Sequence, residues 1–140
     1  MAETAPSPLP RKLGIKPEAR VALLAAPAGL APLLDPLPGG VSVSTALDGT
    51  EPFDVVLAFT TLRAEVADAV ESVRPLMAPA GGLWIAWPKR SSGVPTEVTD
   101  DLVREIALPT GLVDNKVCAI DSTWTGLRLV IRRELRPRAT

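Results

Sequence analysis

The chain has 140 residues, of which 46% are hydrophobic and 22% charged, and this composition is typical of one globular domain. The 15 basic and 16 acidic residues leave a net charge of -1, so the whole chain provides no positive field for nucleic acid or an anionic membrane. It contains no histidine and no tyrosine, which excludes histidine metal sites, histidine-based nucleophilic catalysis and tyrosine acids.

Residues 1–12 are rich in Pro, Ala and Ser and predict a disordered tail, because they offer little apolar surface to bury. No apolar stretch in them has the length that a signal peptide requires, and no later segment approaches the roughly 20 apolar residues that span a bilayer. The single cysteine, Cys118, cannot form an internal disulfide and is interpreted as inert packing. We therefore expect a soluble protein of the reducing cytoplasm.

A single domain is expected over residues 13–134, and its first strand is predicted at residues 20–25. This run is continuously apolar and bounded by turn residues, which is typical of a strand covered on both faces. A short helix is predicted at residues 29–34. The alternation of residues 41–45 then indicates a strand at or near a sheet edge.

The second half of the chain continues the alternation of strands and helices. Buried strands are predicted at residues 54–59 and 83–87, separated by an amphipathic helix over residues 62–77 with Thr61 or Thr60 as its N-cap. Residues 99–108 predict a helix that begins with a cap residue and acidic side chains. Two final strands, at residues 113–120 and 126–133, are joined by a turn short enough to favour an antiparallel hairpin.

These elements predict an α/β fold with a mostly parallel, Rossmann-like sheet, helices on both faces and a C-terminal antiparallel hairpin. Residues 135–140 are expected to form a basic C-terminal tail. We expect one core, formed by apolar residues of the strands: Val21, Leu23, Val55, Leu57, Leu83, Ile85, Val117, Leu129 and Ile131.

The order of elements resembles a shortened Rossmann-like methyltransferase fold. Residues 13–21 look like the segment that leads into its first strand, and residues 81–87 look like its fifth strand. The motifs WPKR at residues 87–90, VDNKVCA at residues 113–119 and WTGLR at residues 124–128 are similar to those of a small bacterial family of unknown function. That second resemblance implies a compact single-domain protein and brings no activity with it.

The methyltransferase resemblance implies a glycine-rich loop after the first strand and an acidic residue after the second, which together bind S-adenosylmethionine. Here the loop is Ala25-Ala26-Pro27-Ala28-Gly29, whose Cβ atoms and missing amide proton oppose close approach of a cofactor. The nearby acid, Asp48, is expected in a turn, and residues 46–53 are too short for the usual helix and third strand. We therefore predict a protein that is not a working methyltransferase.

Ligands of open α/β sheets bind beyond the carboxyl ends of the parallel strands, so a ligand site is expected at that edge. The candidate residues there are Ala26, Pro27, Gly29, Thr60, Thr61, Trp87, Lys89, Arg90, Ser91, Ser92, Asp121, Trp124 and Arg128. We expect Lys89, Arg90 and Arg128 to converge around Trp124 and to suit a small anion, a nucleotide or an acidic segment of a partner protein.

Structural roles compete with this hypothesis. Lys89 and Arg90 also fit a solvated loop, and Asp121 with Arg128 fits a cross-strand pair that steadies the hairpin. An enzyme in which Asp121 or Lys89 transfers a proton is a further alternative. No catalytic residue, metal or cofactor is assigned.

The main functional hypothesis is therefore a non-catalytic binding or regulatory module. The alternative is a divergent S-adenosylmethionine-dependent methyltransferase or another small-molecule enzyme. The expected partner is an anionic small molecule or a protein, with no role for a membrane or nucleic acid. A homo-oligomer, in the simplest case a homodimer, is expected because apolar edge strands leave unpaired backbone to cover.

Overall fold

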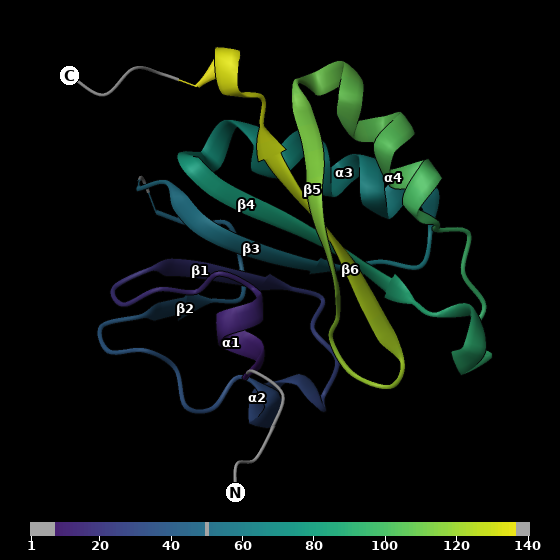
Figure 1. Ribbon diagram of the computed structural model, residues 1–140, viewed down its shortest axis with the longest axis horizontal. Coiled ribbons are helices and arrows are strands. Elements are labelled where there is room, and N and C mark those ends of the chain that lie inside the picture. The colour runs from purple at the N-terminus through teal and green to yellow at the C-terminus, as the bar shows by residue number, and fades with distance from the viewer. Residues whose placement is uncertain (1–7, 50, 137–140) are drawn as a thin grey trace, which may run out of the picture.

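The computed structural model describes residues 8–49 and 51–136, so the expectations for residues 1–7 and 137–140 lie outside the described residues. Its strands are β1 (Arg20–Leu24), β2 (Ser42–Ser44), β3 (Phe53–Phe59), β4 (Met77–Pro88), β5 (Leu112–Ala119) and β6 (Trp124–Ile131). They form one six-stranded sheet in the order β2-β1-β3-β4-β6-β5 (Figure 1). Strands β1 to β4 are parallel, whereas β6 is antiparallel to both β4 and β5. The predicted mostly parallel sheet with a terminal hairpin is confirmed.

Helices cover both faces of this sheet, as predicted. The α-helices are α1 (Leu9–Lys12), α2 (Leu30–Leu33), α3 (Arg63–Val73) and α4 (Asp100–Ala107), and short 3-10 turns occupy Arg74–Leu76, Arg90–Ser92, Leu108–Thr110 and Arg133–Leu135. Helices α3 and α4 lie on one face, and α1 and α2 lie on the other (Figure 1). In the described part of the chain, none of these helices has the length and apolar character that crossing a membrane requires.

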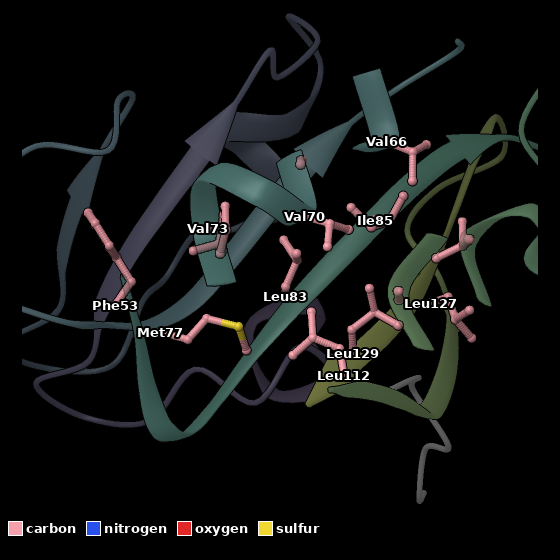
Figure 2. Packing of buried hydrophobic residues seen from close by; sticks show 14 of the residues in the cluster. Phe53, Val66, Val70, Val73, Met77, Leu83, Ile85, Leu112, Leu127 and Leu129 are labelled. Atoms are coloured by element: carbon pink, nitrogen blue, oxygen red, sulfur yellow. The ribbon is translucent and has the colours of Figure 1, made fainter. Parts of the chain in front are cut away.

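The predicted core residues divide between the two faces of the sheet instead of forming one cluster. Leu83, Ile85 and Leu129 pack beneath α3 and α4, where Val66, Val70 and Val73 meet them (Figure 2). Ile131 belongs to the same cluster. Val21, Val55 and Leu57 pack on the opposite face, toward α1 and α2. Because alternate residues of a strand point to opposite faces, a sheet covered on both sides necessarily has two apolar layers.

Val117 is not a core residue, which corrects the sequence-based expectation. Its side chain is 61% exposed, whereas its neighbour Cys118 is buried. Strand β5 is an edge strand, and only one of its faces is covered at this point. Burial raises the pKa of the Cys118 thiol, and Lys12 and Lys116 oppose that shift, so the thiol packs in its neutral form.

The ordered fold begins before Leu13, which also differs from the expectation of a tail over residues 1–12. Leu9 and Leu13 are 8% and 1% exposed, because the α1 turn places them against the sheet. The indole Nε1 of Trp84, a fully buried side chain on β4, donates a hydrogen bond of 3.0 Å to the carbonyl of Leu13. The N-terminal segment is therefore held by packing and by a buried hydrogen bond.

A short connection returns the chain from β2 to β3, and its described residues form no helix or strand. Arg20 holds this connection. Its guanidinium donates to the carbonyl oxygens of Asp48 and Glu51, the latter at 3.1 Å, and lies 4.1 Å above the centre of the Phe53 ring. The methyltransferase fold has a further helix and strand after its second strand, and the sequence predicts that residues 46–53 are too short for them. The described residues of this connection agree with that prediction.

We predict that Trp84→Ala lowers the free energy of unfolding by about 3–5 kcal/mol, because it leaves a large cavity and an unpaired carbonyl at Leu13. Trp84→Phe keeps most of the packing and should cost less. Leu108→Ala is the control, since Leu108 is 42% exposed and its loss should change stability by less than about 0.5 kcal/mol. Urea denaturation measures all three variants, and a Trp84→Ala protein as stable as the wild type contradicts the packing described.

Candidate functional site

The topology of the sheet places one crevice where a ligand is expected. From β1 the chain passes to β2 on one side, whereas from β3 it passes to β4 on the other, so the strand order reverses between β1 and β3. In open α/β sheets, ligands bind at such a reversal, outside the carboxyl ends of the strands. A pocket of about 260 Å³ lies there, which we call the switch-point pocket; it is lined by Leu24, Ala25, Leu47, Ala58, Phe59, Thr60, Glu65, Asp68, Ala69 and Ser72.

The loop after β1 supplies Ala25 to this pocket. Ala25 has a φ of 56°, a left-handed conformation that residues with a Cβ rarely adopt. Of the loop residues predicted for the site, Ala26 and Gly29 are exposed and Pro27 is partly buried, and none of the three lines the pocket. The loop therefore lies at the expected edge, but Ala25 lines the pocket in place of the predicted Ala26.

Thr60 joins the ends of β3 and β4. It is 3% exposed, and both its backbone N–H and its hydroxyl donate to the carbonyl oxygen of Ala86, at 2.8 and 2.9 Å. The Thr60 hydroxyl proton is thus already used, and its oxygen is left as an acceptor on the pocket wall.

The start of α3 is capped by Glu65, and neither Thr60 nor Thr61 is the N-cap, which corrects the prediction. Leu62 occupies the N-cap position. The Glu65 Oε1 atom accepts the backbone N–H groups of Thr61 and Leu62 at 2.8 and 3.1 Å. A glutamate in the first turn can satisfy these free amides without help from a threonine hydroxyl.

The polar part of the switch-point pocket is acidic. Its charged side chains are the carboxylates of Glu65 and Asp68, and no Lys or Arg is found among the described residues that line it. Glu65 caps α3, whereas Asp68 makes no side-chain hydrogen bond or ion pair within residues 8–49 and 51–136. The pocket therefore favours a positively charged group, which is opposite to the anionic ligand expected from the sequence.

A second group of predicted residues lies at the same edge, after β4. The Lys89 backbone N–H donates to the carbonyl of Thr123 at 2.7 Å, and its own carbonyl accepts the hydroxyl of Ser92 at 2.7 Å. Ser91 is exposed. Arg90 and Trp87 line a separate pocket of about 430 Å³ between the end of β4 and the start of α4.

The side chains of Trp87 and Trp124 both pack against other apolar side chains of the fold. Trp87 is 9% exposed and belongs to the apolar layer under α3 and α4, on the face opposite to Trp84. The Trp124 ring packs edge-on against Phe59, with ring centres 5.0 Å apart and planes at 84°. This contact fixes the hairpin turn beside the end of β3.

Asp121 builds the turn of the terminal hairpin. Its Oδ1 atom accepts the backbone N–H groups of Thr123 and Trp124 at 2.8 and 2.7 Å. The alternative of a cross-strand pair with Arg128 is wrong, because neither a hydrogen bond nor an ion pair joins these two residues in the described chain. The same geometry commits this carboxylate to the turn.

Arg128 does not join Lys89, Arg90 and Trp124, so the predicted convergence of these residues is not formed. Arg128 lies opposite Trp84 in the ladder, and its side chain lines a pocket at the amino edge of the sheet. Arg128 lies four positions after Trp124, a distance of about 13 Å along an antiparallel strand that runs away from the carboxyl edge. Arg128 therefore belongs to a different surface.

Solved structures with the same fold include methyltransferases. An S-adenosylmethionine-dependent methyltransferase from Aquifex aeolicus superposes with a TM-score of 0.64 and 15% identity, over 86% of this chain and 87% of that chain. Fibrillarin from Aeropyrum pernix, in complex with natively bound S-adenosyl-L-methionine, has a TM-score of 0.59 and 16% sequence identity, over 83% of this chain and 68% of the fibrillarin chain. The N-methyltransferase NodS from Bradyrhizobium japonicum has a TM-score of 0.54 and 13% sequence identity, over 82% of this chain and 86% of the NodS chain. Identities this low establish a shared fold.

These comparisons correct the functional hypothesis drawn from the sequence. The expected non-catalytic module is wrong as the main hypothesis, because the structures that share the fold include two named methyltransferases and a fibrillarin with bound S-adenosyl-L-methionine, which favours the alternative. The resemblance to the Rossmann-like methyltransferase fold is confirmed. No protein-family model and no curated protein sequence matches the chain, so the similarity of the three motifs to a small bacterial family stays a prediction.

We predict that Asp121→Ala lowers the free energy of unfolding by about 1–2 kcal/mol, because two backbone N–H groups of the hairpin turn lose their acceptor. Asp121→Asn keeps an oxygen at this position and should cost less than about 0.5 kcal/mol. Chemical denaturation monitored by tryptophan fluorescence measures both. Equal losses in the two variants mean that the carboxylate charge, and not the turn geometry, is what matters.

Proposed function

We propose that this chain is a divergent S-adenosylmethionine-dependent methyltransferase and that S-adenosylmethionine binds in the switch-point pocket. The observation that carries the proposal is a pocket between the carboxyl ends of β1 and β3 in which the charged side chains from the described part of the chain, Glu65 and Asp68, are both acidic. S-adenosylmethionine bears a positive sulfonium and a positive ammonium group, which match these carboxylates in sign.

The pocket residues fit parts of this molecule. Leu24, Leu47 and Phe59 provide apolar surface, and the sharp turn at Ala25 leaves small side chains beside it. The volume of about 260 Å³ is close to the lower end, about 300 Å³, of small-molecule sites. When bound, S-adenosylmethionine supplies an electrophilic methyl group, and the protein has to orient it and exclude water.

The methyltransferase resemblance implies a glycine-rich loop and an acidic residue after the second strand as ligand-binding features. Both are missing from this chain, so other residues have to anchor the ligand. The loop after β1 contains Pro27 in place of a glycine-rich sequence. Asp48 does not line the pocket; its Oδ1 lies 3.8 Å from the Arg20 guanidinium. We therefore assign the polar anchoring of the ligand to α3, and to Asp68 in particular, because Glu65 is committed to capping the helix.

We further propose that the protein acts in the cytoplasm as a homodimer and belongs to the small bacterial family with the WPKR, VDNKVCA and WTGLR motifs. The single cysteine supports a reducing compartment. Self-association is supported by the open edge of β5, where Val117 is 61% exposed.

We predict that Asp68→Asn weakens S-adenosylmethionine binding about tenfold or more, because the pocket loses its available negative charge. Isothermal titration calorimetry measures the affinity. Glu71→Gln is the matched control, since Glu71 is an exposed acid of the same helix that does not line the pocket, and it should bind as the wild type does. A wild-type protein that shows no binding at millimolar concentrations, or an Asp68→Asn protein with unchanged affinity, contradicts the proposal.

A further inference from the structure

A second pocket lies at the amino edge of the sheet, opposite the switch-point pocket, and the proposed function does not use it. It has a volume of about 340 Å³. It lies where β1 and β3 begin and beside the first half of β4. Its lining residues are Gly14, Lys16, Pro17, Glu18, Ala19, Asp54, Ala80 and Arg128.

The backbone of β4 makes room for the Arg128 side chain in this pocket. A Cβ atom placed on Gly82 would lie 2.5 Å from Nε and 2.9 Å from Cζ of Arg128, closer than real side-chain atoms approach. The guanidinium therefore fills the space that any side chain at position 82 would occupy. Because Gly82 has no side chain, the Arg128 guanidinium can lie against the sheet at this position.

The Arg128 guanidinium is half-buried, and within the described ranges no acceptor meets it. Neither a side-chain hydrogen bond nor an ion pair of Arg128 is found there, although a guanidinium has five N–H donors to satisfy. Two acidic residues, Glu18 and Asp54, also line the pocket, and neither forms an ion pair with Arg128 in the described chain. Asp54 accepts the backbone N–H of Arg20 at 2.8 Å, and the Cγ atom of Glu18 lies against Gly40.

Arg128 has a positively charged neighbour in Arg136, although the lining of its pocket also contains the carboxylates of Glu18 and Asp54. Burial, and then the positive charge of Arg136, lower the pKa of Arg128 from its ordinary value. Arg136 is held nearby, because its Nε donates to the carbonyl of Ile131 at 2.9 Å. Lys16 lies on the wall of the same pocket. The side-chain nitrogens of Arg128 keep contact with solvent, so an anion in the pocket can reach the guanidinium.

We propose that this amino-edge pocket binds a small oxyanion, the carboxylate or phosphate group of a metabolite, in a two-pronged contact with the Arg128 guanidinium. The planar fork of arginine matches the two oxygen atoms of such a group, and Lys16 adds a second positive charge at the wall. The site is distinct from the switch-point pocket, because the two pockets share no lining residue.

The test is a calorimetric titration of the protein with inorganic phosphate and, separately, with succinate, at an ionic strength held constant with sodium chloride. We expect saturable binding of at least one of the two, and which one binds identifies the oxyanion as a phosphate or a carboxylate. Arg128→Lys keeps the charge but loses the fork, and it should weaken binding about tenfold or more. Arg90→Lys is the control, since Arg90 is exposed and lies at the opposite edge of the sheet.

Gly82→Ala is a second, independent variant, because its methyl group displaces the guanidinium without removing a charge. Circular dichroism verifies that each variant is folded. Loss of binding in both variants with retention in Arg90→Lys supports the proposal. It is overturned if the wild type binds neither phosphate nor succinate, or if Arg128→Lys binds as tightly as the wild type.

Discussion

The contacts of one arginine, Arg20, make the switch-point pocket possible. Its guanidinium binds the carbonyl oxygens of Asp48 and Glu51 and covers the Phe53 ring, and so holds the short connection between β2 and β3. The chain thus returns to the start of β3 without a further strand and helix. Because no such helix covers the end of β1 on this face, Leu24 and Leu47 line a pocket instead of a closed core.

Much of the fold could be predicted because its strands are continuous apolar runs between turn residues. The first half of β4 could not be predicted, since Pro79-Ala80-Gly81-Gly82 has the composition of a loop. In the structure Met77 and Gly82 pair with β3, and the residues between them form an irregularity in the ladder. Helix α1 was missed because a single turn carries no periodicity, and its burial depends on the distant Trp84. Val117 was misplaced because burial on an edge strand depends on which face is covered.

The sheet topology predicts at which edge of the sheet the candidate site lies, but it does not predict the charge of the residues that line the site. Asp68 and Glu65 look like part of a solvated helix face in the sequence, and only the fold turns them toward the end of β3. Arg128 was placed at the wrong edge although the antiparallel direction of β6 was predicted, since four residues of strand are enough to carry it away from the turn. One predicted basic cleft is thus replaced by an acidic pocket and a separate pocket that contains Arg128.

The central claim, that the switch-point pocket binds S-adenosylmethionine, is tested most directly by NMR. Uniformly ¹⁵N-labelled protein is titrated with S-adenosylmethionine, and the backbone amide shifts are followed residue by residue. The account predicts saturable shift changes centred on Ala25, Leu47, Thr60 and Asp68, at the ends of β1 and β3 and on α3. An unchanged spectrum, or changes confined to the 89–92 loop or to the surroundings of Arg128, would contradict it.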